Sequence, residues 1–316
     1  MTPKVFLRKV KTVMRLFNGG RSLRAFYYSL PFAASGKIRR INSGGGLALR
    51  SVIISVTQRC TLRCCKCCAL IQYFKSPQDV PSENIYRDID AIMEKADYVR
   101  RLCFVGGETL LVKELPEYIQ YAIEKYKSKI SFIQIVTNGT VMPSEDYLAK
   151  LKKTRKYLSV GISDYGELSS NADRLNARLR KLRIYSLADK ADSWLFVEQL
   201  IDGESQSSDY AEKTYRKCTK ICPVVLNGKY YHCAFLAHGE MLRAFPYSDD
   251  NHVDILDSNT TKADIAKYQL PENTPPACRY CSGIYGGDDK DAVIIPSAEQ
   301  VKEPVSYKVY EQERQS

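Results

Sequence analysis

The chain has 316 residues, 44% of them hydrophobic and 26% charged, with 11 cysteines and a formal net charge of +11. This length and the odd cysteine count argue against the disulfide framework of a small secreted domain, and no signal peptide is evident. Residues 1–50 contain 4 Lys, 7 Arg and no acidic residue, so they carry the whole excess of positive charge. Because the excess ends there, we expect no nucleic-acid binding.

The first predicted element is a basic amphipathic helix over residues 5–17, with apolar residues at helical spacing and basic residues opposite them. Such a helix suits an anionic membrane, and we expect residues 1–35 of a cytoplasmic protein to contact the inner membrane surface. Packing on the rest of the molecule as a solvated helix is an equal alternative, and an Arg-rich transit peptide is a third. The stretch 23–34 is too short and interrupted to span a bilayer.

Five cysteines then crowd residues 60–68, after a predicted strand at 52–57. Only Cys60, Cys64 and Cys67 give a Cys-x3-Cys-x2-Cys triplet. Three thiolates on one loop can hold three irons of a [4Fe-4S] cluster and leave the fourth iron open. A structural zinc site needs four closed ligands, and no fourth at zinc spacing lies near. For the remaining Cys65 and Cys68, and for Cys103, we expect buried, hydrophobic-like side chains.

Between residues 51 and 201, apolar runs of strand length alternate with helical periodicity, which is typical of βαβ units around a parallel sheet. The predicted fold is α/β, a partial (β/α)6 TIM-like barrel with a small cysteine-rich C-terminal iron–sulfur domain. The six predicted strands are 52–57, 101–105, 132–136, 158–162, 183–186 and 194–200. The predicted helices are 82–96, 113–126, 144–153 and 171–182, with Ser144 and Asn171 as N-caps.

Three motifs follow the predicted strands in order: Gly106-Gly107-Glu108, Thr137-Asn138-Gly139 and Ser163-Asp164-Tyr165-Gly166. With the cysteine triplet they resemble the radical SAM enzymes over about residues 51–201. The resemblance implies that the open iron binds the amino and carboxylate groups of S-adenosylmethionine (SAM). It also implies SAM contacts at Gly106, Gly107, Glu108, Thr137, Asn138, Ser163 and Asp164. Two positions depart from the family pattern, because Lys66 replaces an aromatic residue and Thr109 replaces a frequent proline.

After a polar connection at 202–210, a second cysteine set comprises Cys218, Cys222, Cys233, Cys278 and Cys281. The spacing of Cys218, Gly228 and Cys233 resembles the opening of the SPASM domain and its one-cluster relative, the twitch domain. That resemblance implies one auxiliary [4Fe-4S] cluster. We favour Cys222, Cys233, Cys278 and Cys281 as its ligands, with Cys218 as the competitor.

Asn227-Gly228 predicts a two-residue hairpin that would bring Cys222 and Cys233 together. A zinc ribbon built from Cys218, Cys222 and the later pair Cys278 and Cys281 is the alternative to an auxiliary cluster.

The predicted organisation is an N-terminal extension (1–50), a radical SAM partial barrel (51–205), a twitch/SPASM-like domain (206–287) and a polar tail (288–316). We expect the tail to be peripheral or partly disordered. Candidate acid or base residues are Glu108, Asp164 and Glu198, which lie at or near strand ends, yet none is assigned a catalytic role.

The resemblance implies an oxidoreductase in which one electron cleaves SAM to methionine and a 5′-deoxyadenosyl radical, which then removes hydrogen from the substrate. We rank oxidation of a sugar or alcohol carbon above modification of a peptide. A non-catalytic zinc or iron–sulfur electron carrier is the alternative of another class. The expected partners are a small-molecule, glycan or peptide substrate and a reducing donor such as flavodoxin or ferredoxin.

Overall fold

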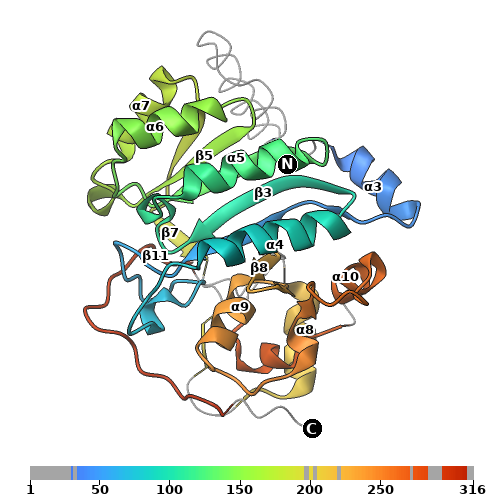
Figure 1. The fold of residues 1–316 in the computed structure, drawn as a ribbon. Coiled ribbons are helices and arrows are strands. Elements are labelled where there is room, and N and C mark those ends of the chain that lie inside the picture. Colours follow the sequence, from blue (N-terminus) through green and yellow to red (C-terminus); the bar gives the residue numbers. More distant parts are fainter. Residues whose placement is uncertain are drawn as a thin grey trace, which may run out of the picture.

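A computed structural model of the chain describes residues 30, 34–195, 199–201, 205–218, 222–270, 273–283 and 294–311 (Figure 1). Its central sheet has the strand order β10-β9-β8-β2-β3-β4-β5-β6, and β1 pairs beside β3. Its strands are β1 (Ala48–Leu49), β2 (Val52–Thr57), β3 (Tyr98–Gly106), β4 (Ile130–Thr137), β5 (Leu158–Asp164), β6 (Tyr185–Lys190), β8 (Val224–Leu226), β9 (Lys229–Tyr231) and β10 (Val253–Asp254). Neighbours from β8 to β6 are parallel, so the predicted α/β class with a mostly parallel sheet is confirmed.

The sixth parallel strand is not the predicted one. We expected residues 194–200 to take that place, but β7 (Ser193–Leu195) pairs antiparallel with β11 (Ile294–Pro296) outside the main sheet. Instead β8 lies beside β2, where all three of its apolar residues are buried. The neighbour of β2 is therefore a three-residue apolar run beyond the expected barrel. An apolar run suits this place, because a strand in a parallel sheet is buried on both faces.

The helices cover this sheet (Figure 1). They are α3 (Ser35–Ser43), α4 (Ser82–Lys95), α5 (Leu115–Tyr126), α6 (Glu145–Lys153), α7 (Ala172–Lys181), α8 (Ser208–Lys217), α9 (Ala234–Met241) and α10 (Lys262–Tyr268). Short 3-10 turns are η1 (Ile71–Tyr73), η2 (Thr109–Leu111), η3 (Gly166–Leu168), η4 (Asp249–Asn251) and η5 (Pro276–Tyr280). Ser144 accepts the N–H of Tyr147 at 3.3 Å and is the predicted N-cap. Asn171 occupies the cap position of α7, but its amide donates to the Thr140 carbonyl at 2.7 Å.

The predicted hairpin at Asn227-Gly228 is confirmed and joins β8 to β9. Both turn residues have positive φ, 54° and 80°, which suits the type I′ turn that Asn-Gly favours. Asp88, fully buried on α4, accepts the N–H of Gly228 at 2.7 Å. The region predicted to begin a separate domain therefore extends the barrel sheet, and the domain boundaries themselves stay a prediction.

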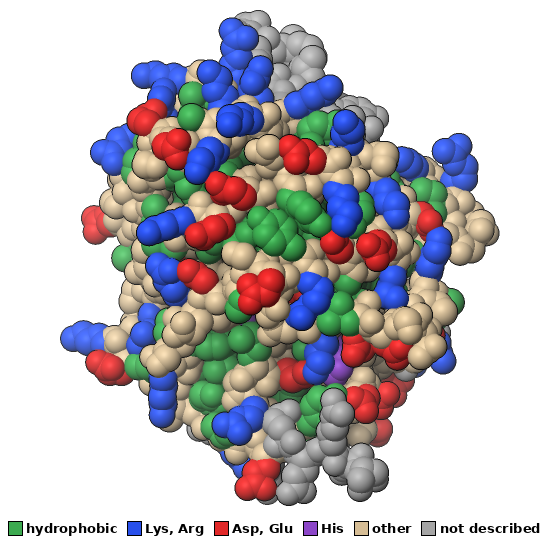
Figure 2. All heavy atoms as spheres, viewed as in Figure 1, with side chains coloured by type: hydrophobic (Ala, Val, Ile, Leu, Met, Phe, Trp, Pro, Cys, Tyr) green, Lys and Arg blue, Asp and Glu red, His purple; other side chains and the backbone are tan. Residues whose placement is uncertain are grey.

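Lys and Arg side chains intermix with Asp and Glu over the face that Figure 2 shows. This matches the neutral charge balance predicted for the chain after residue 50. The basic helix predicted at 5–17 lies outside the described residues. Among the helices in the described ranges, none combines the length and the apolar character needed to cross a bilayer.

Candidate functional site

The cysteine loop leaves the end of β2 and is held by the glycine motif at the end of β3. The N–H of Gly107 donates to the Thr57 carbonyl at 2.9 Å, and the N–H of Glu108 donates to the Arg59 carbonyl at 2.8 Å. A Cβ on Gly107 would lie 2.9 Å from Cys60 Cβ, and one on Gly106 would overlap the Thr57 backbone. Both glycines are therefore required by the close approach of two backbones, one of which carries Cys60.

Glu108 is fully buried and joins two of the predicted motifs. Its two carboxylate oxygens accept the N–H groups of Leu110 at 2.9 Å and Asn138 at 2.7 Å. Burial raises the pKa of Glu108, although these backbone donors favour its charged form. Thr109, in the position where proline is frequent, donates its hydroxyl to the Val136 carbonyl at 2.6 Å. These contacts fix the end of β3 against the end of β4.

Asn138 links the second motif to the cysteine loop. Its Nδ2 lies 3.1 Å from Thr61 Oγ1 and 3.6 Å from Cys60 Sγ, while its Oδ1 accepts the N–H of Thr140 at 3.0 Å. The neighbouring Thr137 is buried and accepts the N–H of Gly139 at 3.2 Å. The structure thus brings Asn138 to the loop, whereas the contact of Thr137 lies within its own turn.

The third motif closes the same edge at the end of β5. The Ser169 hydroxyl donates to the Asn138 carbonyl at 2.6 Å and lies 3.2 Å from the Ser163 carbonyl. Asp164 accepts the N–H of Gly166 at 3.0 Å, which shapes the turn after the strand. The three motifs therefore meet at the carboxyl ends of β3, β4 and β5, where parallel α/β folds bind ligands.

Tyr165 is a site residue that we did not predict. Burial raises the pKa of its hydroxyl to about 12, and the thiols of Cys64 and Cys67 add to this shift. The ring also packs edge-on against Trp194, with the centroids 5.6 Å apart. An aromatic residue directly after the Ser163-Asp164 pair was the available signal. Its place beside the loop depends on the path of β5, which spacing alone does not give.

The thiols of the loop influence one another electrostatically, and besides burial, Cys65 as well as Cys60 raises the pKa of Cys64. Burial raises the pKa of Cys64 to about 11 and that of Cys67 to about 12, and the Cys60 thiol adds to both shifts. Backbone N–H groups approach two of the sulfurs, from Leu62 to Cys60 at 3.4 Å and from Ile71 and Ala69 to Cys67. Such donors stabilise thiolates bound to iron, so this donor set fits a [4Fe-4S] cluster.

Cys65 is directed to another partner, since its thiol lies 3.5 Å from Glu299 Oε2. Glu299 belongs to residues 299–310, which we call the C-terminal strap. The Cys65 N–H donates to the Glu299 carbonyl at 2.7 Å, and the Val301 N–H donates to the Arg63 carbonyl at 2.9 Å. The segment is exposed or half-buried, as expected of a peripheral tail, but it is paired with the cysteine loop, which was not predicted. Besides these backbone hydrogen bonds, Val305 and Tyr307 of the strap pack against the hydrophobic core. Two such residues leave no apolar periodicity in the sequence.

Electrostatic contacts connect several thiols of the second cysteine set, whose ligand assignment stays a prediction. Burial raises the pKa of Cys278 to about 12, and the nearby Cys218 thiol contributes. Cys233 and Cys278 both raise the pKa of Tyr268, whose main cause is burial. Cys281 pairs with Leu200 in an isolated bridge. These contacts gather Cys218, Cys233 and Cys278 in one region.

Cys222 interacts electrostatically with the barrel thiol Cys103. Burial raises the pKa of Cys103 to about 11, with Arg101 opposing the shift and Cys222 adding to it. In the described ranges, no group of three or more His, Cys, Asp or Glu side chains is close enough to hold a metal ion. The ligands of a cubane bind different iron atoms, and they are therefore spaced more widely than the ligands of a single ion.

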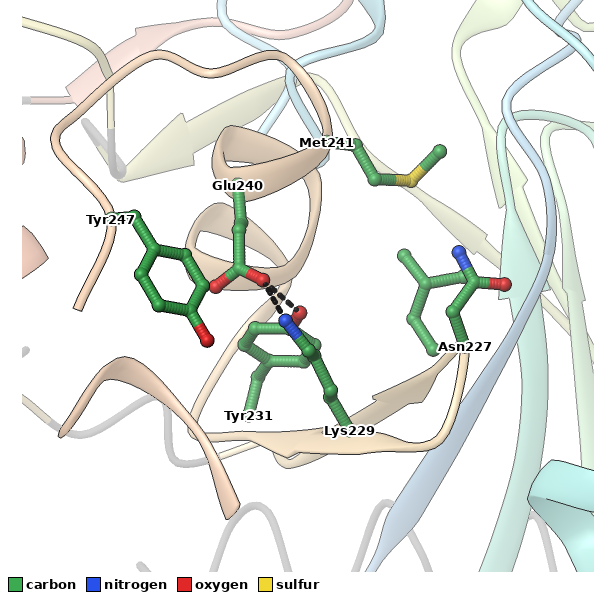
Figure 3. A pocket seen from close by; sticks show the side chains of 7 residues that line it. Asn227, Lys229, Tyr231, Glu240, Met241 and Tyr247 are labelled. Atoms are coloured by element: carbon green, nitrogen blue, oxygen red, sulfur yellow. Dashed lines mark hydrogen bonds and ion pairs between the residues drawn. The ribbon is translucent and has the colours of Figure 1, made fainter. Parts of the chain in front are cut away.

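A pocket of about 340 Å³ lies between the β8–β9 hairpin and α9 (Figure 3). Glu240 accepts from Lys229 Nζ at 2.6 Å and from the Tyr231 hydroxyl at 3.1 Å. Burial alone would raise the pKa of Glu240, but His252 and Lys229 hold it below its usual range. Met241 also lines the pocket, and its Sδ lies 3.9 Å from Nε2 of Gln58. Gln58 precedes Cys60 by two residues.

Comparison with known proteins agrees with this geometry. Residues 54–190 match the family model of the Radical SAM superfamily. A GTP 3′,8-cyclase of Clostridium botulinum (strain Okra / Type B1) is 23% identical over 261 residues, covering 75% of this chain and 77% of that protein. The GTP 3′,8-cyclase of Campylobacter jejuni (strain RM1221) is 33% identical over 109 residues, covering 34% of this chain and 32% of that protein.

Two solved structures resemble the fold more distantly. One is described as native anSMEcpe with bound AdoMet, with a TM-score of 0.49 and 16% identity over 74% of this chain and 88% of that one. The other is BtrN in complex with AdoMet and 2-DOIA, with a TM-score of 0.44 and 16% identity over 74% and 93%.

Proposed function

Because the chain belongs to the radical SAM superfamily through residues 54–190, we propose that Cys60, Cys64 and Cys67 hold its SAM-binding [4Fe-4S] cluster. The single observation that carries this assignment is the loop itself. Cys60 lies against Gly107 and Asn138 at the shared strand edge, whereas the Cys65 thiol lies 3.5 Å from Glu299 Oε2. When bound, the cluster supplies the electron that cleaves SAM reductively and starts hydrogen abstraction from the substrate.

The residues of the three motifs position this loop in our proposal. Gly106 and Gly107 let the end of β3 pass against the cysteine loop, and Glu108 fixes the end of β4 beside it. We also propose SAM contacts for four residues at the carboxyl ends of β4 and β5, which share an edge with the cysteine loop: Thr137, Asn138, Ser163 and Asp164. Tyr165 joins them as a buried aromatic group next to the thiols.

For the auxiliary cluster we propose Cys218, Cys233, Cys278 and Cys281. This replaces Cys222 of the favoured set by Cys218. The exchange is supported by the thiol of Cys218, which adds to burial in raising the pKa of Cys278. The thiol of Cys222 instead adds to burial in raising the pKa of Cys103. In this proposal a reducing protein such as flavodoxin or ferredoxin supplies the electrons.

As substrate we propose an anionic small molecule, with a nucleoside triphosphate as the first compound to test. Arg101 on β3 is held by Ser51 Oγ at 3.0 Å and Gln134 Oε1 at 2.9 Å. Both partners are neutral, and no carboxylate within the described residues pairs with its guanidinium. Arg101 lies five residues before Gly106, in the amino-terminal half of β3, so it would meet a phosphate or carboxylate of a substrate that extends from the carboxyl ends of the strands into the barrel. The relatives named GTP 3′,8-cyclase give the nucleotide priority.

The prediction that a sugar or alcohol carbon is oxidised gains no support from these relatives, whose name describes a cyclisation. Modification of a peptide keeps its rank below a small molecule. The two outcomes differ in mass, because an oxidation gives a product two mass units lighter and a cyclisation without net oxidation does not.

The test begins with anaerobic reconstitution and counts of iron and sulfide. About eight iron per chain supports two cubanes, and changing Cys60, Cys64 and Cys67 to Ala should remove about half of it. Zinc at about one or two per chain would instead reject the proposal. Reduced protein with SAM and GTP should then release 5′-deoxyadenosine and a changed nucleotide. Abundant 5′-deoxyadenosine with unchanged GTP would reject the nucleotide and keep the chemistry.

A further inference from the structure

The C-terminal strap brings the side chain of Gln300 onto a sulfur of the cysteine loop. Its Nε2 lies 3.2 Å from Cys64 Sγ and 2.5 Å from the Ala298 carbonyl, while its Oε1 accepts the N–H of Arg63 at 2.6 Å. Because the Arg63 N–H only donates and the Ala298 carbonyl only accepts, the amide has one possible orientation. The group that faces the Cys64 sulfur is therefore an N–H donor.

Backbone contacts on both sides hold Gln300 in place. Glu299 and Val301 pair with Cys65 and Arg63, and Cys64 forms a bridge with Gln300 itself. Farther along the strap, the Val305 N–H donates to the Gln72 carbonyl at 2.9 Å. The amide is thus presented from a paired segment, which lowers the entropy cost of keeping the hydrogen bond.

We propose that Gln300 is a positioning residue that raises the reduction potential of the SAM-binding cluster through an N–H···S hydrogen bond to Cys64. This inference rests on the proposed function, because it needs the cluster at Cys60, Cys64 and Cys67. Reduction adds negative charge, which the cluster shares with its thiolates. A donor to sulfur therefore stabilises the reduced form more than the oxidised form.

Two variants separate the hydrogen bond from the shape of the side chain. Gln300→Glu keeps an acceptor for the Arg63 N–H and places a carboxylate oxygen toward Cys64, whereas Gln300→Leu removes the polar groups altogether. The matched control is Glu303→Gln, an exposed position on the same strap. The midpoint potential of the SAM-binding cluster is measured by redox titration with electron paramagnetic resonance, in protein whose auxiliary cysteines are changed to Ala.

We expect both Gln300 variants to shift the potential to more negative values. At a fixed potential near the midpoint, the ratio of reduced to oxidised cluster should fall about fivefold for Leu, the equivalent of one net hydrogen bond, and further for Glu. Glu303→Gln should leave the ratio unchanged. Wild-type potentials in both Gln300 variants would overturn the proposal.

If a variant does not hold the cluster, two measurements separate a role at the sulfur from a structural role: the iron content, and the thermal unfolding of the metal-free chains. Loss of iron with an unchanged unfolding temperature supports a direct role at the sulfur. Loss of iron with a lowered unfolding temperature assigns Gln300 a structural role and overturns the proposal. If wild-type protein takes up no cluster at the triplet, the proposed function fails first, which is a different result.

Discussion

Glu108 gives the sharpest test at the scale of single residues. Changing it to Gln keeps the volume but leaves only one oxygen for the N–H groups of Leu110 and Asn138. One buried donor then lacks a partner, and we expect the free energy of unfolding to fall by about 1–3 kcal/mol. Urea unfolding of the metal-free chain measures this loss.

The matched control for that change is Glu114→Gln, since Glu114 is exposed and its side chain makes no capping bond. It should alter stability by less than about 0.5 kcal/mol. Equal effects of the two substitutions would show that Glu108 does not join the ends of β3 and β4 as described.

Arg101 is the residue on which the proposed substrate class depends. Its replacement by Gln removes the charge, and we expect KM for an anionic substrate to rise at least about tenfold, consistent with the loss of a charge-assisted hydrogen bond. Formation of 5′-deoxyadenosine without substrate should persist. A tenfold loss of that uncoupled reaction would place Arg101 in SAM binding instead.

Spacing alone was enough to select Cys60, Cys64 and Cys67 as the predicted cluster ligands, because the triplet depends only on local sequence. It did not decide between Cys218 and Cys222, since both precede the same hairpin, and only the fold shows that Cys222 lies near Cys103. Gln300 could not be found from sequence, because its contact joins residues 236 positions apart.

At the scale of elements, Asp88 anchors the β8–β9 hairpin to α4 and makes stability depend on pH. Burial raises the pKa of Asp88 to about 6, against the N–H donors of the turn. The folded chain therefore holds this proton more tightly than the unfolded chain. As pH rises from about 4 to about 6, this carboxyl should remove about 1–3 kcal/mol from the free energy of unfolding.

Asp88→Asn keeps an oxygen for the Gly228 N–H and cannot ionise. Urea unfolding between pH 3.5 and 7 should show that this variant gains stability over the wild type as pH rises. The control is Asp250→Asn on the exposed turn η4, which should follow the wild-type profile. Parallel profiles for Asp88→Asn and wild type would contradict the role of burial.

Most elements of the barrel could be predicted because periodicity is a local property. The strands β2 to β5 and the helices α4 to α7 appear within a few residues of their expected ends. The sixth strand could not be predicted in this way. Residues 194–200 and 224–226 are both apolar runs, and the choice between them depends on which one reaches the edge of β2.

At the scale of the whole molecule, the C-terminal strap connects the two cysteine sets. One end pairs with Arg63 and Cys65, and at the other end Tyr310 packs edge-on against Tyr280, with the centroids 5.4 Å apart. Tyr280 stands between Cys278 and Cys281. A polar segment of this kind has no periodicity that would predict its course, so this long-range connection is known only from the structure.

The strap should therefore protect the cysteine loop from solvent. Ending the chain after Ser297 removes the bonds to Arg63 and Cys65 together with the contact of Gln300 to Cys64. We expect oxygen to bleach the loop cluster at least about threefold faster, because local opening becomes easier once these bonds are lost. Absorbance at the iron–sulfur band, followed after air exposure in protein without auxiliary cysteines, measures the rate.

The control is a chain that ends after Glu311, which retains every strap contact, and its cluster should bleach at the wild-type rate. Equal rates for both truncations would mean that the strap does not shield the loop.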